Sequence, residues 1–198
     1  RDDRIRALEG ARKQIEADAK TRARADQDAE AATVLLLERI GVALNAINSA
    51  TTAADVFEAL NDHISQYFNK TVVFQVGAAG FKGWLGRGVG KTAEIGQLAI
   101  PRHIDALLKR AVADRKLVTA TQGDGHPPVG LANSPIGGAV ALPVVTSDKV
   151  IAVAYAEAAE GASSVLSATG AKLAEVLIDH ISRRLTTKSK TSAPGSSN

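Results

Sequence analysis

A glycine-rich segment, residues 86–92, is the part of the sequence that most resembles a catalytic motif. It ends in Gly-Lys-Thr, as a phosphate-binding P-loop does, where backbone N–H groups and the lysine surround the phosphates. The spacing differs by one residue, because the first glycine of that motif would stand where this chain has Leu85. We therefore expect a glycine-rich connection here and keep a nucleotide-binding enzyme as a distant alternative.

Other side chains that could act as nucleophiles or metal ligands are scattered or missing. The chain has no cysteine, which excludes disulfides, thiolate zinc sites and thiol nucleophiles. Asp148 follows an apolar run, as a magnesium-binding Asp would, but its neighbours are typical of a hairpin turn. We expect no catalytic residue, no metal site and no cofactor. The four histidines, which lack metal-ligand spacing, are His63, His103, His126 and His180.

Charge and hydropathy exclude further classes. The formal net charge is +3, but residues 1–30 hold eight basic and eight acidic side chains, and the last residues add Lys188 and Lys190. No basic face for nucleic acid is implied. No stretch approaches the roughly 18 to 20 apolar residues of a membrane span, and the N-terminus is charged where a signal peptide is apolar. We expect a cytoplasmic protein with no membrane insertion.

The N-terminal third predicts a long helix. Acidic side chains stand four residues before basic ones, as in Glu9/Lys13 and Glu16/Lys20, and Gly10 is the single glycine of residues 1–30. A heptad frame runs in one register from residue 5 to residue 47. We expect a coiled-coil-like extension over residues 1–30. Because basic and acidic residues also fall on this frame, a solvated single helix is the alternative.

The rest of the chain alternates between helical and strand patterns. A helix capped by Thr51 or Thr52 precedes a hairpin over residues 71–85, and a second hairpin spans residues 139–155. Between them we expect a strand at residues 95–100, a helix over residues 102–114 entered at Pro101, a short strand at 117–119 and a long loop. An amphipathic helix over residues 164–186 closes the chain before a disordered tail at 188–198.

This order resembles the GAF domain family. An apolar strand ending in Leu142-Pro143, a polar turn, a second apolar strand ending at Tyr155 and a closing amphipathic helix carry the resemblance. Gly83 and Trp84 begin a segment similar to the second strand of bacterial signalling GAF domains. The resemblance covers residues 31–187, and a PAS-like domain is the nearest competitor.

The resemblance implies an α+β sandwich, in which a central antiparallel sheet carries the N- and C-terminal helices on one face. The other face would hold a small-molecule pocket, and the terminal helices would build a dimer. The Asn-Lys-Phe-Asp-Glu motif of the cyclic-nucleotide binders is absent, as are the cysteines of the bilin binders and methionine sulfoxide reductases. A non-catalytic regulatory module is therefore expected.

Two sets of residues follow as candidates. The first, placed by the resemblance around the pocket, would bind a ligand: Phe81, Trp84, Arg102, His103, His126 and Tyr155. The second lies on the heptad frame and the closing helix and would form a homodimer: Ile5, Leu8, Ile15, Leu36, Ile40, Ile47, Leu173, Leu177, His180 and Ile181.

We expect this module to be a homodimer that senses a small molecule or a protein partner and passes a change along its N-terminal helix. The alternative is a structural docking scaffold with a filled pocket and no ligand.

Overall fold

The computed structural model describes residues 2–89, 92–120, 138–158 and 164–191. The side chains of residues 2–9, 11, 92–93, 164–167 and 188–191 lie outside this description. The chain divides into two compact units, Arg1–Val42 and Ala43–Asn198. The long helix α1 (Asp2–Ser49) forms the first unit and supplies its last turns to the second.

The second unit is built around one antiparallel sheet of six strands in the order β3-β2-β1-β6-β5-β4. The four longer strands are β1 (Lys70–Val76), β2 (Gly80–Arg87), β5 (Ala139–Thr146) and β6 (Lys149–Glu157), and they form two hairpins joined through β1 and β6. The short strands β3 (Ala99–Pro101) and β4 (Val118–Thr119) lie at the two edges.

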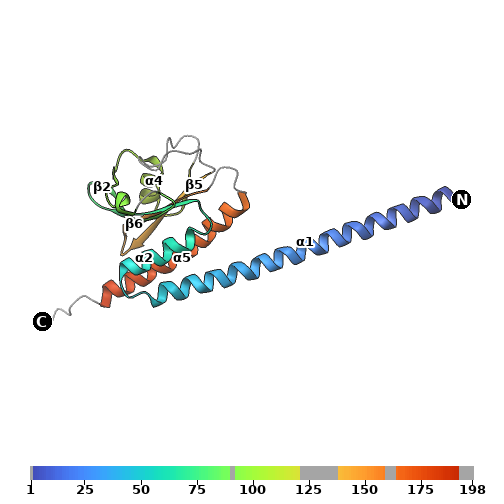
Figure 1. The fold of residues 1–198 in the computed structure, drawn as a ribbon, viewed down its shortest axis with the longest axis horizontal. Coiled ribbons are helices and arrows are strands. Elements are labelled where there is room, and N and C mark those ends of the chain that lie inside the picture. The colour runs from blue at the N-terminus through green and yellow to red at the C-terminus, as the bar shows by residue number, and fades with distance from the viewer. Residues whose placement is uncertain (1, 90–91, 121–137, 159–163, 192–198) are drawn as a thin grey trace. The chain divides into compact units, whose positions relative to one another are not determined.

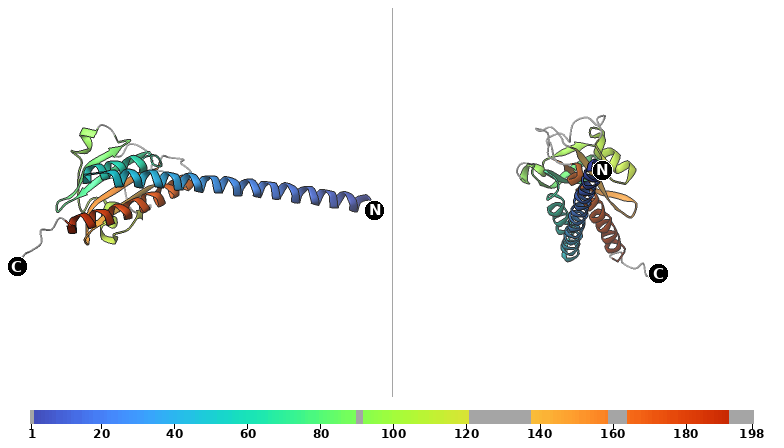
Figure 2. Two further views of the ribbon diagram at one scale, coloured as in Figure 1. Left: turned by 90° about the horizontal axis from the view of Figure 1, so that it is seen from below. Right: turned by 90° about the vertical axis from the view of Figure 1, so that its right-hand side faces the viewer.

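Helices cover both faces of the sheet. Helices α2 (Ala53–Ile64) and α5 (Ser164–Thr191) lie on one face, and α4 (Ala106–Asp114) lies on the other (Figure 1 and Figure 2). The predicted α+β sandwich, with terminal helices packed on one face, is confirmed. Helix α5 continues to Thr191, beyond residue 187, where we expected the domain to end.

Both predicted hairpins and the cap of α2 are confirmed. Thr52 accepts a hydrogen bond from the Asp55 N–H, and the Asp55 carboxylate accepts one from the Thr52 N–H, so the two form a capping box. The hydrogen bond from the Thr52 N–H stabilises the charged carboxylate and lowers the pKa of Asp55. In the second hairpin, Ser147 and Asp148 form the two-residue turn with φ of 44° and 68°, the left-handed conformation that such hairpin turns require.

The strand predicted at residues 95–100 and the helix predicted over residues 102–114 are both present, but each begins later than predicted. Ile95, expected to begin the strand, ends a single helical turn, α3 (Thr92–Ile95), and Pro101 belongs to β3 (Ala99–Pro101) instead of opening the next helix. Asp105 is the residue that begins α4, because its carboxylate accepts a hydrogen bond from the Leu108 N–H at 2.8 Å. Pro101 can occupy β3 because an edge strand tolerates a residue without an N–H.

The face of the sheet beneath α4 is filled with large apolar side chains. Phe74, Phe81 and Tyr155 are almost completely buried there with residues of α4 and β3. The Tyr155 hydroxyl donates a hydrogen bond of 2.6 Å to Glu157, whose other carboxylate oxygen lies 3.4 Å from Lys70 Nζ. Burial, and next the bond to Glu157, raise the pKa of Tyr155 above its ordinary value.

On the face of the sheet beneath α2 and α5, a side-chain hydrogen bond and an aromatic contact join the sheet to α2. The buried Thr71 hydroxyl donates to the Asn61 side chain of α2 at 2.7 Å. On β2, a bulge makes Trp84 an extra residue beside the β1 register, and its ring lies 5.1 Å from that of Phe57. Because α2 supplies both Asn61 and Phe57 to these contacts with the sheet, the helix is fixed in position along the sheet.

A first prediction concerns Gly83, where a Cβ would strike the main-chain carbonyl of Ile95 in α3. Since a backbone atom cannot rotate away, Gly83→Ala should lower the free energy of unfolding by about 1 to 3 kcal/mol, as overpacking does. Chemical denaturation followed by circular dichroism measures the change. Gly41→Ala is the matched control, because a Cβ there meets nothing within 4 Å; it should be neutral or stabilising by up to about 1 kcal/mol. Equal effects at both positions would contradict the close packing.

A second prediction concerns Tyr155. Tyr155→Phe removes a donor from the buried Glu157 carboxylate and should cost about 1 to 3 kcal/mol at pH 7. Because the pKa of Tyr155 is raised in the folded state, its contribution is complete below about pH 10, where the unfolded tyrosine ionises, and is lost above it. Unfolding free energies measured between about pH 9 and pH 11 should therefore fall more steeply for the original protein than for the variant. Equal slopes would contradict this.

Candidate functional site

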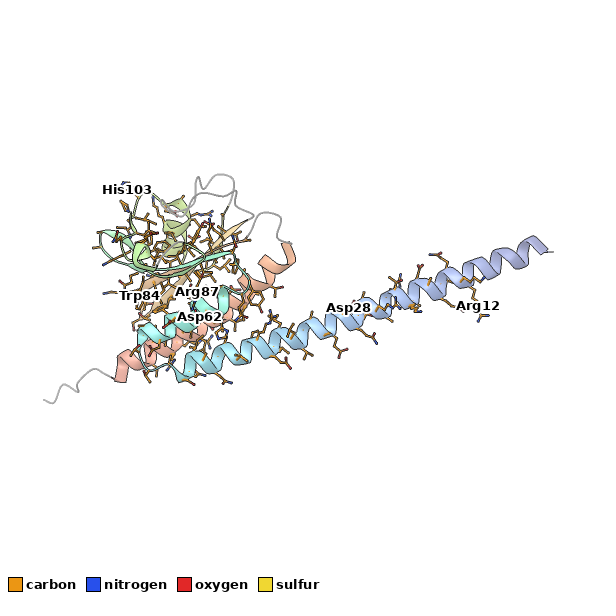
Figure 3. All side chains as sticks on the ribbon, viewed as in Figure 1. Arg12, Asp28, Asp62, Trp84, Arg87 and His103 are labelled. Carbon is orange, nitrogen blue, oxygen red and sulfur yellow. The ribbon has the colours of Figure 1, made fainter. Side chains whose placement is uncertain are left out.

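The predicted ligand-binding residues do not come together in one site. Phe81 and Tyr155 lie on the α4 face, where they form the core that fills the expected pocket. Trp84 lies on the opposite face against α2, since the bulge in β2 directs it toward Phe57. Figure 3 shows Trp84 on the side of the sheet that α2 and α5 cover, and His103 on the opposite side.

The remaining predicted ligand residues are exposed or outside the description. Arg102 and His103 lie on the surface in the turn between β3 and α4, and His126 lies outside the described residues. A hollow of about 550 Å³ at the β1–β2 turn is lined by residues 75–82 and 99–101, so Phe81 is the one described member of the predicted set that borders it.

The glycine-rich segment has a structural explanation. Strand β2 continues through Gly86, and a Cβ at that position would lie 2.7 Å from the Ile95 side chain. The helix that follows is the four-residue α3, whereas a P-loop needs a long helix whose N-terminus faces the phosphates. Lys91 lies outside the described residues. Glycine is required here so that α3 can approach the sheet.

Metal binding finds no support in the described part of the chain, where no group of three or more His, Asp or Glu side chains gathers. His63 is a half-buried residue of α2. His180 lies on α5, where its Nε2 is 2.8 Å from the side-chain oxygen of Asn48.

Within the second unit, the end of α1 is held by α5. The last carbonyl groups of a helix have no partner inside that helix, and Arg184 of α5 donates to two main-chain oxygens at this end, Asn48 O at 3.1 Å and Ala50 O at 2.5 Å. A cation at a helix C-terminus also interacts favourably with the helix dipole. We call Arg184, His180, Asn48 and Ala50 the α1 clamp.

Four of the predicted dimer residues lie in the interior of the second unit. Ile47, Leu173, Leu177 and Ile181 are buried inside one copy of the chain, with at most 2% of their surface exposed. The reason is that the inner stripe of α5 packs on β5 and α2, and the end of α1 packs inside the same unit. His180 is likewise occupied by the α1 clamp.

The other predicted dimer residues lie on α1 ahead of this end. Ile15 is 68% exposed, and Leu36 and Ile40 are half-buried. The side chains of Ile5 and Leu8 lie outside the described residues.

Sequence reasoning missed four other exposed apolar residues of α1. Leu37 and Val42 are 62% and 61% exposed, and Val34 and Leu35 are about half exposed. We call residues 34–42 the α1 apolar segment. In the sequence this segment could have been found from its run of four consecutive apolar residues, 34–37. A heptad stripe contains only two positions in seven, so it cannot include all four. By contrast, residues between Arg12 and Asp28 carry mainly charged and small side chains (Figure 3).

None of the described helices combines the length and apolar character needed to cross a membrane.

Comparisons with known proteins identify the fold. No family model and no curated protein sequence matches this chain. Among solved structures, the chain is similar to the GAF domain of a phosphoenolpyruvate-protein phosphotransferase from Coxiella burnetii, with a TM-score of 0.63 and 10% identity over 80% of this chain and 97% of that one.

Two further structures agree. The GAF domain of an Acinetobacter phosphoenolpyruvate-protein phosphotransferase has a TM-score of 0.58 and 10% identity, covering 77% of this chain and 95% of that domain. The phytochrome photosensory core module of Stigmatella aurantiaca has a TM-score of 0.54 and 14% identity over 81% of this chain, which corresponds to 38% of that larger chain. With its six-stranded antiparallel sheet and covering helices, this chain has the fold of bacterial signalling GAF domains.

Proposed function

We propose that this chain is a non-catalytic regulatory module of a signalling protein, which dimerises through α1 and uses that helix to pass on a conformational change. The observation that carries the proposal is the α1 apolar segment. It belongs to the same continuous helix whose end is held in the α1 clamp. The fold supports it, because similar structures include a photosensory module and domains of phosphotransferase proteins. The proposal includes a cytoplasmic location and no nucleic-acid partner.

The α1 apolar segment favours a second copy of the chain as its partner. Exposed apolar surface of this kind marks an interaction site, and two copies present the same surface to each other in a twofold dimer. Residues 1–30 have as many acidic as basic side chains, so two such helices side by side carry no net repulsion.

The arrangement of the segment favours a bundle over a simple pair of helices. Successive residues of an α-helix are turned by about 100°, so residues 34–37 point around most of the circumference. A two-stranded coiled coil covers a single stripe on each helix. Burial of this segment therefore requires more than one neighbouring helix, as a bundle provides.

The α1 clamp gives the module a way to bias that bundle. It connects the end of α1 with α5, which packs on β5, so a shift of α5 against the sheet changes the support of α1. In a two-state module, such a shift selects between two packings of the helices. No bond is made or broken in this mechanism.

A third prediction tests dimerisation by analytical ultracentrifugation of the full chain. The unmodified protein should sediment as a dimer at tens of micromolar, and Leu37→Glu should weaken the dimer at least about tenfold because it buries a charge among apolar side chains. Ile104→Glu is the control, since Ile104 is 50% exposed in the second unit and its change should leave the dimer intact. A monomeric unmodified protein, or a Leu37→Glu dimer of full strength, would contradict the proposal.

A fourth prediction concerns the α1 clamp. Arg184→Met keeps the apolar stem but removes the donors to Asn48 and Ala50, which should cost about 1 to 3 kcal/mol and speed amide hydrogen exchange near residues 44–50. Arg183→Met is the matched control on the same turn, because Arg183 is 78% exposed and pairs with Asp179 on the surface. Its cost should stay within about 0.5 kcal/mol. Similar exchange in the two variants would show that Arg184 does not hold α1.

A further inference from the structure

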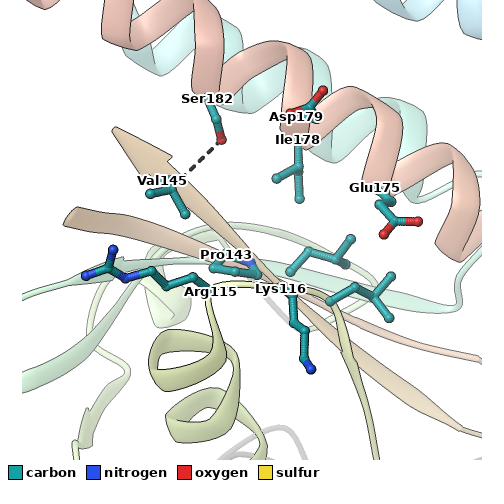
Figure 4. Close-up of a pocket in the computed structure, with 10 residues that line it drawn as sticks. Arg115, Lys116, Pro143, Val145, Glu175, Ile178, Asp179 and Ser182 are labelled. Atoms are coloured by element: carbon teal, nitrogen blue, oxygen red, sulfur yellow. Dashed lines mark hydrogen bonds between the residues drawn. The ribbon is translucent and has the colours of Figure 1, made fainter. Parts of the chain in front are cut away.

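A groove opens beside β5 at the point where β4 stops. Among the described residues, strand β4 pairs with Val140 and Ala141 of β5 alone, and β5 continues to Thr146 with no described strand on its outer side. Between this edge and α5 lies a cavity of about 470 Å³ (Figure 4). We call it the β5–α5 groove. Its volume falls in the range of small-molecule sites, about 300 to 1,000 Å³.

The groove cannot be closed by an added strand. Pro143 has no N–H to offer, and the N–H of Val145 already donates to the Ser182 hydroxyl at 3.1 Å (Figure 4). A strand that docks on a sheet edge needs such donors for its main-chain bonds. The occupant must therefore be recognised by its side groups and charges.

The floor of the groove is apolar and its rims carry opposite charges. Leu142, Pro143 and Ile178 supply apolar contact. On one rim, Arg115 and Lys116 follow the end of α4, and on the other, Glu175 and Asp179 project from α5 (Figure 4). This separation of cationic and anionic rims distinguishes the groove from a surface that would bind a simple anion or cation.

The charged groups on the rims are held only by weak surface pairs. Glu175 pairs with Lys172 on its own helix, and Asp179 pairs in the same way with Arg183. The Arg115 guanidinium lies 3.9 Å from Asp148, which is almost fully exposed. Exposed pairs of this kind contribute little to stability. Within the described residues Lys116 makes no hydrogen bond or ion pair, and the other three charged groups can exchange their weak surface pairs for contacts with a ligand.

We propose that the β5–α5 groove binds a zwitterionic molecule with an apolar body, of the class of short apolar peptides with free ends. The carboxylate lies toward Arg115 and Lys116, the ammonium group toward Glu175 and Asp179, and the apolar side chains cover the floor. A peptide is favoured over a single amino acid because a second hollow, of about 340 Å³, shares Lys116 and Glu175 and extends along α5 to Ala168.

The position of the groove also connects a ligand with the α1 clamp. Asp179 and Ser182 line the groove, while His180 and Arg184, on the same stretch of α5, hold the end of α1. A molecule bound between β5 and α5 therefore acts on the helix that supports α1. This consequence rests on the proposed function, whereas binding in the groove does not.

A fifth prediction tests the groove with trileucine as the probe and the full chain as the protein, by isothermal titration calorimetry. Trileucine should bind, and Lys116→Gln and Glu175→Gln should each weaken binding at least about fivefold. Trileucine acetylated at its N-terminus or amidated at its C-terminus should lose affinity to a similar degree. The controls are Lys109→Gln on α4 and Glu58→Gln on α2, both exposed and distant from the groove lining, and neither should change the affinity.

Absence of binding would overturn the inference, as would unchanged binding in Lys116→Gln and Glu175→Gln or equal affinity for the blocked peptides. Sedimentation of the same samples separates this result from the proposed function. A dimer that binds no trileucine overturns the groove assignment and leaves the dimer proposal standing. A monomer that binds trileucine through both rims overturns the dimer proposal and leaves the groove assignment standing.

Discussion

The burial of strand β6 on both faces is the constraint on which the other features depend. Every residue from 152 to 157 is buried, and the side chains alternate between the two layers. Val153 and Tyr155 point into the core beneath α4, whereas Ala152 and Ala154 face the layer of α2 and α5. Large side chains thus occupy one layer and small ones allow close approach of helices in the other. With the centre of the sheet filled, space for a ligand remains at its margins.

Helix α5 relates the margin of the sheet to α1. One side of the helix is committed to the core through Leu173, Leu177 and Ile181. Around the rest of its circumference it offers Ser182 to β5 and Arg184 to the last carbonyls of α1. Three different partners therefore depend on the placement of one helix. A displacement of α5 toward one of them must therefore be accommodated by the other two.

The sequence predicted the fold well where local patterns coincide with burial. The second hairpin could be predicted because two apolar runs flank a short polar turn. A cap at Thr51 or Thr52 could be predicted from their place before an amphipathic stripe, and the structure selects Thr52. Pro101 was misread because proline suits both a helix start and an edge strand. The bulge at Trp84 leaves no clear mark in the sequence, so the face to which that ring points required the structure.

The site was harder to predict than the fold. The heptad frame led to Ile47, and the apolar stripe of the closing helix led to His180, as contacts between copies. In the structure Ile47 is buried within one copy and His180 contacts Asn48 of the same copy. Periodicity identifies a side chain that will be buried but does not name its partner. The groove rims are brought together from the end of α4 and the middle of α5, which lie about sixty residues apart, and no spacing rule relates them.

The two shortest strands occupy the two edges of the sheet, β3 with three residues and β4 with two. Exposed edges of long strands act as templates on which other chains add and form fibrils. Here each edge offers few free main-chain groups, and the longer stretch of β5 beyond β4 is interrupted by Pro143. A second copy of the chain therefore finds little main-chain edge on which to extend this sheet, which disfavours fibril growth from the folded domain.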